Sequence, residues 1–262
     1  MYKRQPEGVR SIREKTFCEC TALQEIRLPD GLELIGRSAF SECEALQEIR
    51  LPDGLKEIGS DAFSGCRSLR QITVPVGVKC IETAVFQSCR ALQEVHLPEG
   101  LEQIGMFAFE DCDTLTRIVL PASLKRLCRG AFENCTSLLE AQLPDGLEEL
   151  QDDAFEYCRS LQKVTIPAQV RQIERAAFYY CQSLQEVQLP EELNEIGEDA
   201  FAHCWALKRI VIPAGVEKVG EHAFWECYSL QNIAVLSDDT EIAEDAFEDC
   251  PGTVKRGTGS LF

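Results

Sequence analysis

Hydrophobic residues recur along this chain at a fixed interval of 23 residues. The copy that begins at Leu28 reads LPDGLELIGRSAFSECEALQEIR, and its apolar positions return in the copies that follow. Phenylalanine and cysteine hold the most regular of these positions, from Phe17 to Phe247 and from Cys20 to Cys250. A unit this short cannot bury its own apolar face, so we expect the copies to stack into one continuous solenoid.

Each copy predicts one short strand that ends at a proline. Ile26 and Leu28 are apolar whereas Glu25 and Arg27 are polar, and this alternation is typical of a strand with one buried face. Pro29 ends the strand because it has no N–H to donate. Ten parallel strands are predicted, near residues 25, 48, 71, 94, 117, 140, 163, 186, 209 and 232.

The second half of each copy predicts the outer, convex side of the solenoid. The segment Gly36 to Phe40 suggests a short helical or 3-10 turn, with the Phe40 side chain buried beneath it. The predicted fold class is therefore α/β, with about ten strands on the concave side and short helical turns on the convex side. A single domain over residues 1–250 would hold a partial first copy and ten full copies, and residues 251–262 would form a flexible C-terminal tail.

The pattern LxxIxLPxxLxxIGxxAFxxC resembles the BspA-like, or treponemal-type, class of leucine-rich repeats. The resemblance covers residues 6–250. It implies a leucine-rich-repeat solenoid in the shape of a horseshoe and a role in protein binding. It also implies a bacterial protein that is secreted or placed on the cell surface, where members of the class are proposed to act in adhesion.

Charge and hydropathy exclude several kinds of partner. The formal net charge is −18 at pH 7, and a strongly acidic chain repels the phosphate backbone of nucleic acids. No run of 18 apolar residues is present, so we expect no membrane insertion. The N-terminal residues Met1 to Pro6 are not followed by an apolar stretch, so we expect neither a signal peptide nor an anchor in this chain.

The cysteine pattern predicts a column of thiols. Of the 14 cysteines, 11 recur once per copy at intervals of 23 residues, from Cys20 to Cys250. Stacked copies place such side chains about 4.8 Å apart and parallel, whereas a disulfide needs converging Cβ atoms. We interpret the column as buried thiols that act as small hydrophobic side chains. Disulfides and a zinc site are the alternatives, although zinc needs four converging ligands.

Residues suited to catalysis are scattered. His96, His203 and His222 lie in different copies, and none stands in an arrangement typical of a nucleophile with its base. The paired carboxylates fit the acidic surface of a repeat better than a glycosidase cleft, and no phosphate-binding glycine motif occurs. We therefore predict no catalytic residues, no cofactor and no metal site, and a protein that is not an enzyme. The strict register argues against an inserted hydrolase domain.

Charge alternates between neighbouring copies. Equivalent strand positions hold Arg117, Glu140, Lys163, Glu186 and Arg209. Opposite charges would then lie on adjacent strands and neutralise one another. This column of the concave face is therefore a poor attractor for a charged partner.

Aromatic residues gather late in the chain. Both tryptophans and four of the five tyrosines lie between Tyr157 and Tyr228, at positions that hold serine or glutamate in earlier copies. The core therefore does not require aromatic side chains there, and partner surfaces are enriched in them. Packing at the edge of the solenoid is the alternative interpretation. The predicted partner-binding residues are Tyr157, Tyr179, Tyr180, His203, Trp205, Trp225 and Tyr228.

These observations predict a binding module without chemistry of its own. We expect a protein partner, with a glycan as the alternative ligand, and a chain that is a monomer or a weak dimer formed through an exposed edge. An acidic rim of Glu156, Glu226 and Asp249 would favour a neutral or basic partner. The alternative binding face is the concave sheet, through residues such as His96, Gln142 and Gln188. The alternative function is a structural spacer in a larger surface protein.

Overall fold

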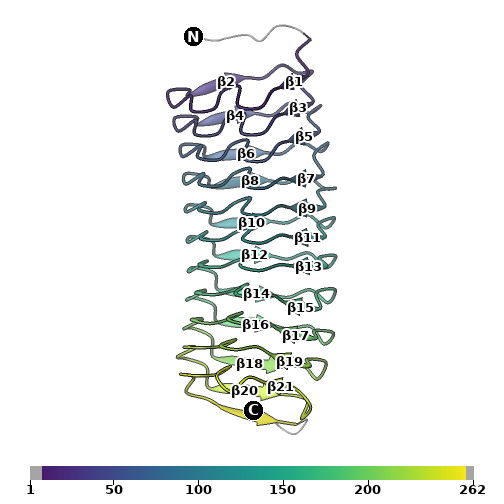
Figure 1. Cartoon of the computed structure of the whole chain (residues 1–262), viewed down its shortest axis with the longest axis vertical. Coiled ribbons are helices and arrows are strands. Elements are labelled where there is room, and N and C mark those ends of the chain that lie inside the picture. The colour runs from purple at the N-terminus through teal and green to yellow at the C-terminus, as the bar shows by residue number, and fades with distance from the viewer. Residues whose placement is uncertain (1–7, 258–262) are drawn as a thin grey trace.

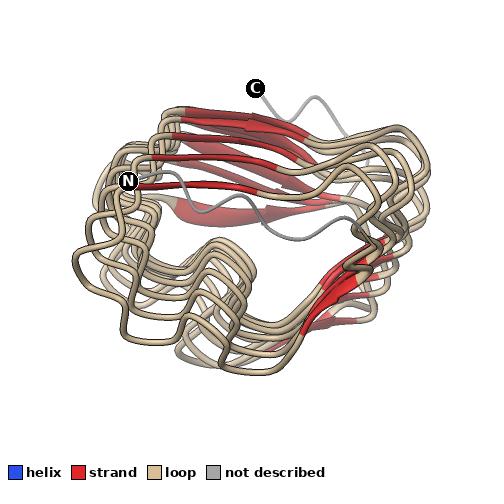
Figure 2. Ribbon diagram, turned by 90° about the horizontal axis from the view of Figure 1, so that it is seen from above, coloured by secondary structure: helices blue, strands red, loops and turns tan. Residues whose placement is uncertain are grey.

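The chain folds into a column of stacked coils, each one repeat long. The structure, a computed structural model, describes residues 8–257. Figure 1 shows the coils following one another from the N-terminal to the C-terminal end, with the strands in two rows. Figure 2 shows the rows on separate walls of the coil, with loops forming the remaining walls. Strands within a row pair in parallel, one repeat apart in sequence.

The first row contains all ten predicted strands, and each begins at the predicted residue. The middle residue of a strand, such as Val164, is buried while its neighbours are exposed, because successive side chains point to opposite faces. The ten strands are β2 (Glu25–Arg27), β4 (Glu48–Arg50), β6 (Gln71–Thr73), β8 (Glu94–His96), β10 (Arg117–Val119), β12 (Glu140–Gln142), β14 (Lys163–Thr165), β16 (Glu186–Gln188), β18 (Arg209–Ile212) and β20 (Asn232–Val235).

A second row of strands lies after the proline of each repeat, and the sequence did not predict it. Each member has only two residues, too few to show a period of two. The second residue, such as Ile58, packs into the core. These strands are β1 (Ser11–Ile12), β3 (Leu34–Ile35), β5 (Glu57–Ile58), β7 (Cys80–Ile81), β9 (Gln103–Ile104), β11 (Arg126–Leu127), β13 (Glu149–Leu150), β15 (Gln172–Ile173), β17 (Glu195–Ile196), β19 (Lys218–Val219) and β21 (Glu241–Ile242).

The predicted helical turns are wrong: residues 8–257 contain no helix, so the fold is built from strands and turns rather than α/β. We call the segment between a second-row strand and the next first-row strand the turn segment. Its backbone conformation explains the absence of a helix. In the turn segment after β3, Ser38 has φ of 52° and Glu42 has φ of 56°. A right-handed helix needs negative φ at every residue, so two left-handed residues four positions apart interrupt it.

Hydrogen bonds between coils take the place of the helical ones. The N–H of Phe40 donates to the carbonyl of Ala62 in the next coil at 2.8 Å, and the N–H of Ser38 donates in the same direction to Ser60 at 2.9 Å. The same bonds recur through most of the stack, always from one coil to its C-terminal neighbour. The turn segments therefore bind coil to coil, as the strands do.

The predicted boundary at residue 250 also needs correction. The segment predicted as a flexible tail, residues 251–262, contains β22 (Thr253–Arg256), which pairs in parallel with β20 and adds an eleventh member to the first row. Val254 stands opposite Ile233 in this pairing. The glycine-rich, basic composition hid this strand, because it is not followed by the proline that ends most first-row strands. Residues 1–7 and 258–262 lie outside the described part of the chain.

The phenylalanine column forms the centre of the core. The rings from Phe40 to Phe224 are fully buried, one per coil. Neighbouring rings stack nearly parallel, with centroids 5.2 Å apart for Phe109 and Phe132 and 5.4 Å apart for Phe132 and Phe155. The column therefore couples each coil to both of its neighbours.

The cysteine column confirms the interpretation as buried thiols. All 14 cysteines are free, and those from Cys43 to Cys227 are buried within this column. Each thiol donates to the carbonyl of the phenylalanine 26 residues earlier, as Cys135 does to Phe109 at 3.1 Å. Burial raises the pKa of Cys89 to about 12. These thiols are therefore protonated at neutral pH and serve as donors inside the core.

Candidate partner-binding site

The seven residues that the sequence predicts for partner binding lie in the turn segments of four consecutive coils. These segments follow β13, β15, β17 and β19 and precede β14, β16, β18 and β20. Their side chains form one set, which we call the aromatic patch: Tyr157, Tyr179, Tyr180, His203, Trp205, Trp225 and Tyr228.

Ring contacts join the aromatic patch into one cluster. The ring centroids of Tyr157 and Tyr180 lie 5.2 Å apart, and those of Tyr180 and His203 lie 4.2 Å apart. Trp225 packs edge-on against His203 at 4.7 Å, and Tyr180 also reaches Trp205 at 5.9 Å. The cluster thus spans all four coils, as the sequence predicts from the shared columns.

The backbone explains why these side chains meet. Tyr157, Tyr180 and His203 occupy the same position of successive repeats, directly before the cysteine, and their φ angles are 57°, 59° and 60°. A side chain on an identical backbone in the next coil is displaced by one strand spacing, about 4.8 Å. Aromatic rings at this position therefore stack on their neighbours.

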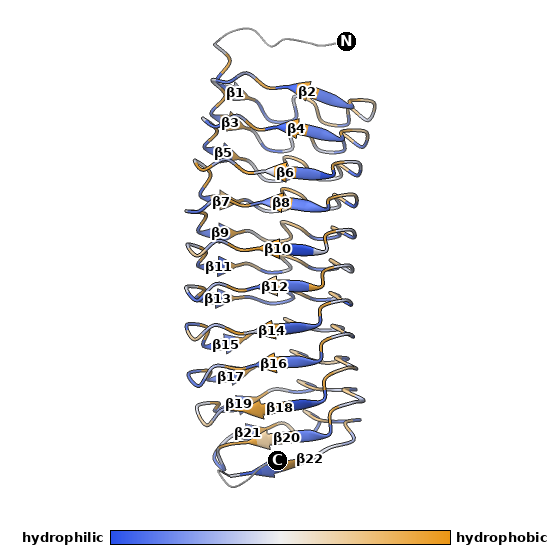
Figure 3. Cartoon of the chain, turned by 180° about the vertical axis from the view of Figure 1, so that it is seen from behind, coloured by the Kyte–Doolittle hydropathy of each residue, from blue (hydrophilic) through white to orange (hydrophobic). Residues whose placement is uncertain are grey.

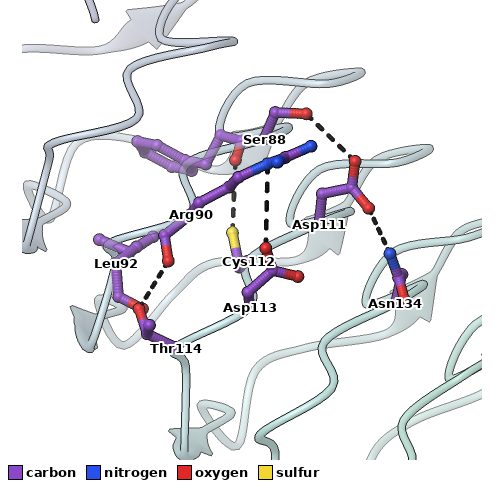
Figure 4. Close-up of polar contacts among 9 residues, drawn as sticks. Ser88, Arg90, Leu92, Asp111, Cys112, Asp113, Thr114 and Asn134 are labelled. Carbon is purple, nitrogen blue, oxygen red and sulfur yellow. Dashed lines mark hydrogen bonds and ion pairs between the residues drawn. The ribbon is translucent and has the colours of Figure 1, made fainter.

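Earlier coils use the same column for hydrogen bonds. Asp111 accepts from the Ser88 hydroxyl at 3.3 Å and from the Asn134 side-chain amide at 2.5 Å, as Figure 4 shows. The column therefore changes from polar contacts to ring contacts at Tyr157, while the backbone stays the same. The phenylalanine and cysteine columns of the core are the same on both sides of this change.

Burial divides the aromatic patch into an inner and an outer part. His203 is only 4% exposed and lies under the neighbouring rings. Trp205 and Tyr228, in contrast, are 38% and 53% exposed, and their ring centroids lie 6.4 Å apart on adjacent coils. Edge packing accounts for the inner rings, but it leaves large faces of Trp205 and Tyr228 in solvent.

Glu226 lies where the inner and outer parts meet. It occupies the same column as His203, and its Oε2 atom is 2.8 Å from His203 Nδ1, at an angle outside hydrogen-bond geometry. A hydrogen bond with this carboxylate raises the pKa of Tyr228 to about 12. The side chain of Glu226 is 24% exposed, so its negative charge is partly shielded from water.

Half-buried carboxylates border the aromatic patch on its N-terminal side. Glu133 and Glu156 occupy one column of adjacent coils. Burial raises the pKa of Glu133 to about 7, and the negative charge of Glu110 adds to this. Burial likewise raises the pKa of Glu156 to about 7, with Glu133 as the second cause. These two groups therefore titrate near neutral pH.

The raised pKa values predict a pH dependence of stability. Because the folded-state pKa of Glu133 and Glu156 is about 7 and the ordinary value is 4.5, the folded chain binds more protons between these values. Stability should therefore fall as the pH rises through 7. We expect the free energy of unfolding to be about 2 kcal/mol higher at pH 5.5 than at pH 8, which allows for solvent screening of half-exposed groups. Urea denaturation at the two pH values measures it.

The variant Glu133→Gln/Glu156→Gln should lose most of this difference and should be more stable than the natural chain at pH 8. The exposed Glu99→Gln provides a control that removes a carboxylate far from the site and should keep the full pH dependence. A natural chain with equal stability at both pH values would contradict the assignment.

The structure does not bring the three histidines to one site. His96 lies on β8 with its Nε2 atom 3.0 Å from Glu94 Oε1, whereas His203 and His222 both contact Trp225 near the other end of the column. Among residues 8–257, no group of three histidine, cysteine or carboxylate side chains could hold a metal ion. None of the described residues forms a helix that could cross a lipid bilayer.

The exposed face of the first row is the alternative binding surface. Figure 3 colours the strands of this row from β2 to β16 mainly as hydrophilic. Gln142 and Gln188 are exposed there, together with His96. A shallow groove crosses β2 to β8, and the sequence analysis did not predict it. The glutamines Gln24, Gln47 and Gln93, which recur at one repeat position and line the groove, could have indicated it. The predicted residues Gln142 and Gln188 do not line it.

The predicted alternation of charge on the first row is confirmed. Arg117 and Glu140 form an ion pair at 3.3 Å on paired strands. Glu186 pairs on one side with Lys163 at 3.4 Å and on the other with Arg209 at 3.3 Å. These exposed pairs contribute little to stability, typically about 0–1 kcal/mol each. They neutralise this column, which leaves the aromatic patch as the more distinctive surface.

One protein-family model matches nearly all of the described residues. A model described as a BspA-type leucine-rich repeat region of six copies matches residues 10–139, 57–184 and 129–254. No curated protein matches the chain.

Several bacterial proteins of known structure are similar to this chain. A leucine-rich repeat protein from Bacteroides ovatus is 28% identical, with a TM-score of 0.84 over 98% of this chain and 70% of that one. A leucine-rich cell surface protein from Faecalibacterium prausnitzii is 25% identical, with a TM-score of 0.52 over 99% and 87%. The pneumococcal vaccine antigen PcpA, 22% identical with a TM-score of 0.59 over 98% and 68%, shares the fold.

Proposed function

Because this chain belongs to the BspA-type leucine-rich repeat family, we propose that it is a non-catalytic module that binds a protein at the bacterial cell surface. Proteins with this repeat and fold are typically binding proteins rather than enzymes. The similar protein from Faecalibacterium prausnitzii is described as a cell surface protein, which supports this location.

The observation that carries the proposal is the aromatic patch. Its outer members, Trp205 and Tyr228, keep large exposed ring faces although the column needs no aromatic residue. Tyrosine and tryptophan dominate the binding energy of many protein interfaces because they bury a large area at a low entropic cost. Four coils at about 4.8 Å per coil give a patch roughly 15–20 Å long, the size of a small protein hot spot.

The test compares two faces of the same protein. The natural chain is immobilised, proteins from the surface of host cells are passed over it, and the retained species are identified and titrated. We expect Tyr180→Ala/Trp205→Ala to weaken binding of a retained protein at least about tenfold, which is the loss of one hot spot. The matched variant His96→Ala/Gln142→Ala/Gln188→Ala, on the first row, should bind as the natural chain does.

Thermal melts show whether each variant is folded. Loss of binding only in the first-row variant would move the site to the sheet. If no retained protein distinguishes either variant from the natural chain, the proposal is wrong and the solenoid is a structural spacer. Retention of a glycan in place of a protein, abolished by the same patch variant, would keep the site and replace the ligand class.

A further inference from the structure

We infer that the outer part of the aromatic patch binds an arginine side chain of the partner, between the rings of Trp205 and Tyr228 and the carboxylate of Glu226. The inference rests on the proposed function, because it identifies the side chain of a protein partner that would bind here. The inference does not depend on the identity of that protein.

The exposed rings of Trp205 and Tyr228 form the surface that we call the shelf, and Glu226 lies beside it. Trp205 and Tyr228 occupy the same position of adjacent coils, directly after the cysteine, with centroids 6.4 Å apart and planes inclined by 32°. Both side chains are exposed, so a group from a partner can reach them. A planar cation placed on such faces is attracted by the negative charge above each ring.

The carboxylate beside the shelf supplies the counter-charge. Glu226 has its oxygens near the Tyr228 hydroxyl and His203 Nδ1, and a carboxylate has about four lone-pair sites, so it retains capacity for further donors. Its partial burial weakens the screening of its charge by water, which strengthens an ion pair made there. A guanidinium can stack on the rings and donate to this carboxylate at once, because its donors lie in the plane of the group.

The chain already contains a guanidinium that lies over a ring of the aromatic patch. Arg159 occupies the same position as Trp205, two coils earlier, and its guanidinium lies 5.7 Å from the ring centroid of Tyr157. Arg159 thus covers the tyrosine at the N-terminal end of the aromatic patch. At the C-terminal end this position holds Trp205 and Tyr228, so the partner must supply the cation.

Charge around the shelf favours the same ligand. Residues 198–250 contain 12 acidic and 3 basic residues, a net charge of −9 that is half of the −18 of the whole chain. This field attracts a cationic segment and repels acidic glycans and phosphates. Arginine is favoured over lysine because an ammonium is a strongly hydrated point charge that cannot stack as a plane.

The test uses three peptides that differ only in one kind of side chain. The probe is acetyl-Gly-Arg-Gly-Arg-Gly-amide, and the same peptide with lysine or with citrulline serves for comparison. Binding is followed by tryptophan fluorescence and by the shift of the Trp205 indole N–H in NMR spectra. We expect the arginine peptide to bind about tenfold more tightly than the citrulline peptide and about threefold more tightly than the lysine peptide, with binding weakened by salt.

Three variants locate the site. Trp205→Ala should abolish the response of the arginine peptide, and Glu226→Gln should weaken binding about tenfold. Glu248→Gln removes one charge from the neighbouring coil, where the carboxylate lies 3.9 Å from His222 Nε2, and should change the affinity by less than about twofold. An unchanged Trp225 indole signal in Glu226→Gln shows that the inner rings remain packed.

The outcomes separate this inference from the proposed function. Equal binding of the arginine and citrulline peptides, or full binding by Trp205→Ala, overturns the arginine site. Binding of the neutral oligosaccharide maltohexaose to the same rings, with no preference for arginine, also overturns it. The protein-binding proposal stands or fails separately, on whether Tyr180→Ala/Trp205→Ala loses a retained protein.

Discussion

Phe132→Ala is expected to lower the free energy of unfolding by about 3–5 kcal/mol. The ring is fully buried and lies between the rings of Phe109 and Phe155, with centroid distances of 5.2 and 5.4 Å. Its removal loses the transfer free energy of the ring and leaves a cavity that the fixed backbones of both neighbouring coils cannot close. Equilibrium denaturation in urea measures the loss.

Phe107 provides a matched control in a neighbouring coil. It lies outside the phenylalanine column and is partly exposed, with φ of 56°. Phe107→Ala should therefore cost clearly less than Phe132→Ala, at most about 2 kcal/mol, because the ring keeps part of its surface in water and its loss leaves no enclosed cavity. A cost for Phe132→Ala no larger than that for Phe107→Ala would show that the column is not the centre of the core.

Ala176→Gly is expected to leave the free energy of unfolding unchanged or to raise it by up to about 1 kcal/mol, because relief of the left-handed backbone offsets the loss of a buried methyl group. Ala176→Val is expected to destabilise the chain by about 2 kcal/mol or more. Ala176 has φ of 52°, and its N–H donates to the carbonyl of Glu198 in the next coil at 2.9 Å. Glycine adopts this left-handed conformation without strain, whereas a β-branched residue is strongly disfavoured there.

The sign of the effect distinguishes this backbone from a helical one. Within a helix, glycine in place of alanine costs roughly 0.5–1 kcal/mol. Ala177, the next residue, is fully buried and is not among the residues with positive φ. Ala177→Gly should therefore destabilise the chain by about 1–2 kcal/mol, because it loses a buried methyl group and adds freedom to the unfolded chain. Destabilisation by both glycine variants would contradict the left-handed assignment.

The strands of the first row could be predicted because three residues suffice to show one buried side chain between two exposed ones. The second row could not, since a pair such as Glu57–Ile58 carries no period. The turn segments misled the prediction for a different reason. Their left-handed residues are mostly serine, aspartate, alanine or tyrosine, so the usual signal of a glycine is present only at positions such as Gly65 and Gly130.

The aromatic patch was predictable as a set of columns but not as a surface. The fixed repeat places Tyr180 next to His203, and the structure agrees. Which rings are covered depends on side-chain packing between coils, and the sequence does not show that His203 is buried while Tyr228 is exposed. The contact of Glu226 with His203 likewise appears only when neighbouring coils are stacked.

Hydrogen bonds of the turn segments join each coil to both of its neighbours. The N–H of Phe40 donates to Ala62 in the following coil, and the thiol of Cys66 donates back to the carbonyl of Phe40. These bonds recur at equivalent positions, so successive junctions between coils are built in the same way. A gene that encodes such a stack can lengthen or shorten by whole repeats while each junction remains intact. The alternation of Arg117 with Glu140 favours copying of two repeats at a time, because a single inserted copy would place like charges on adjacent strands.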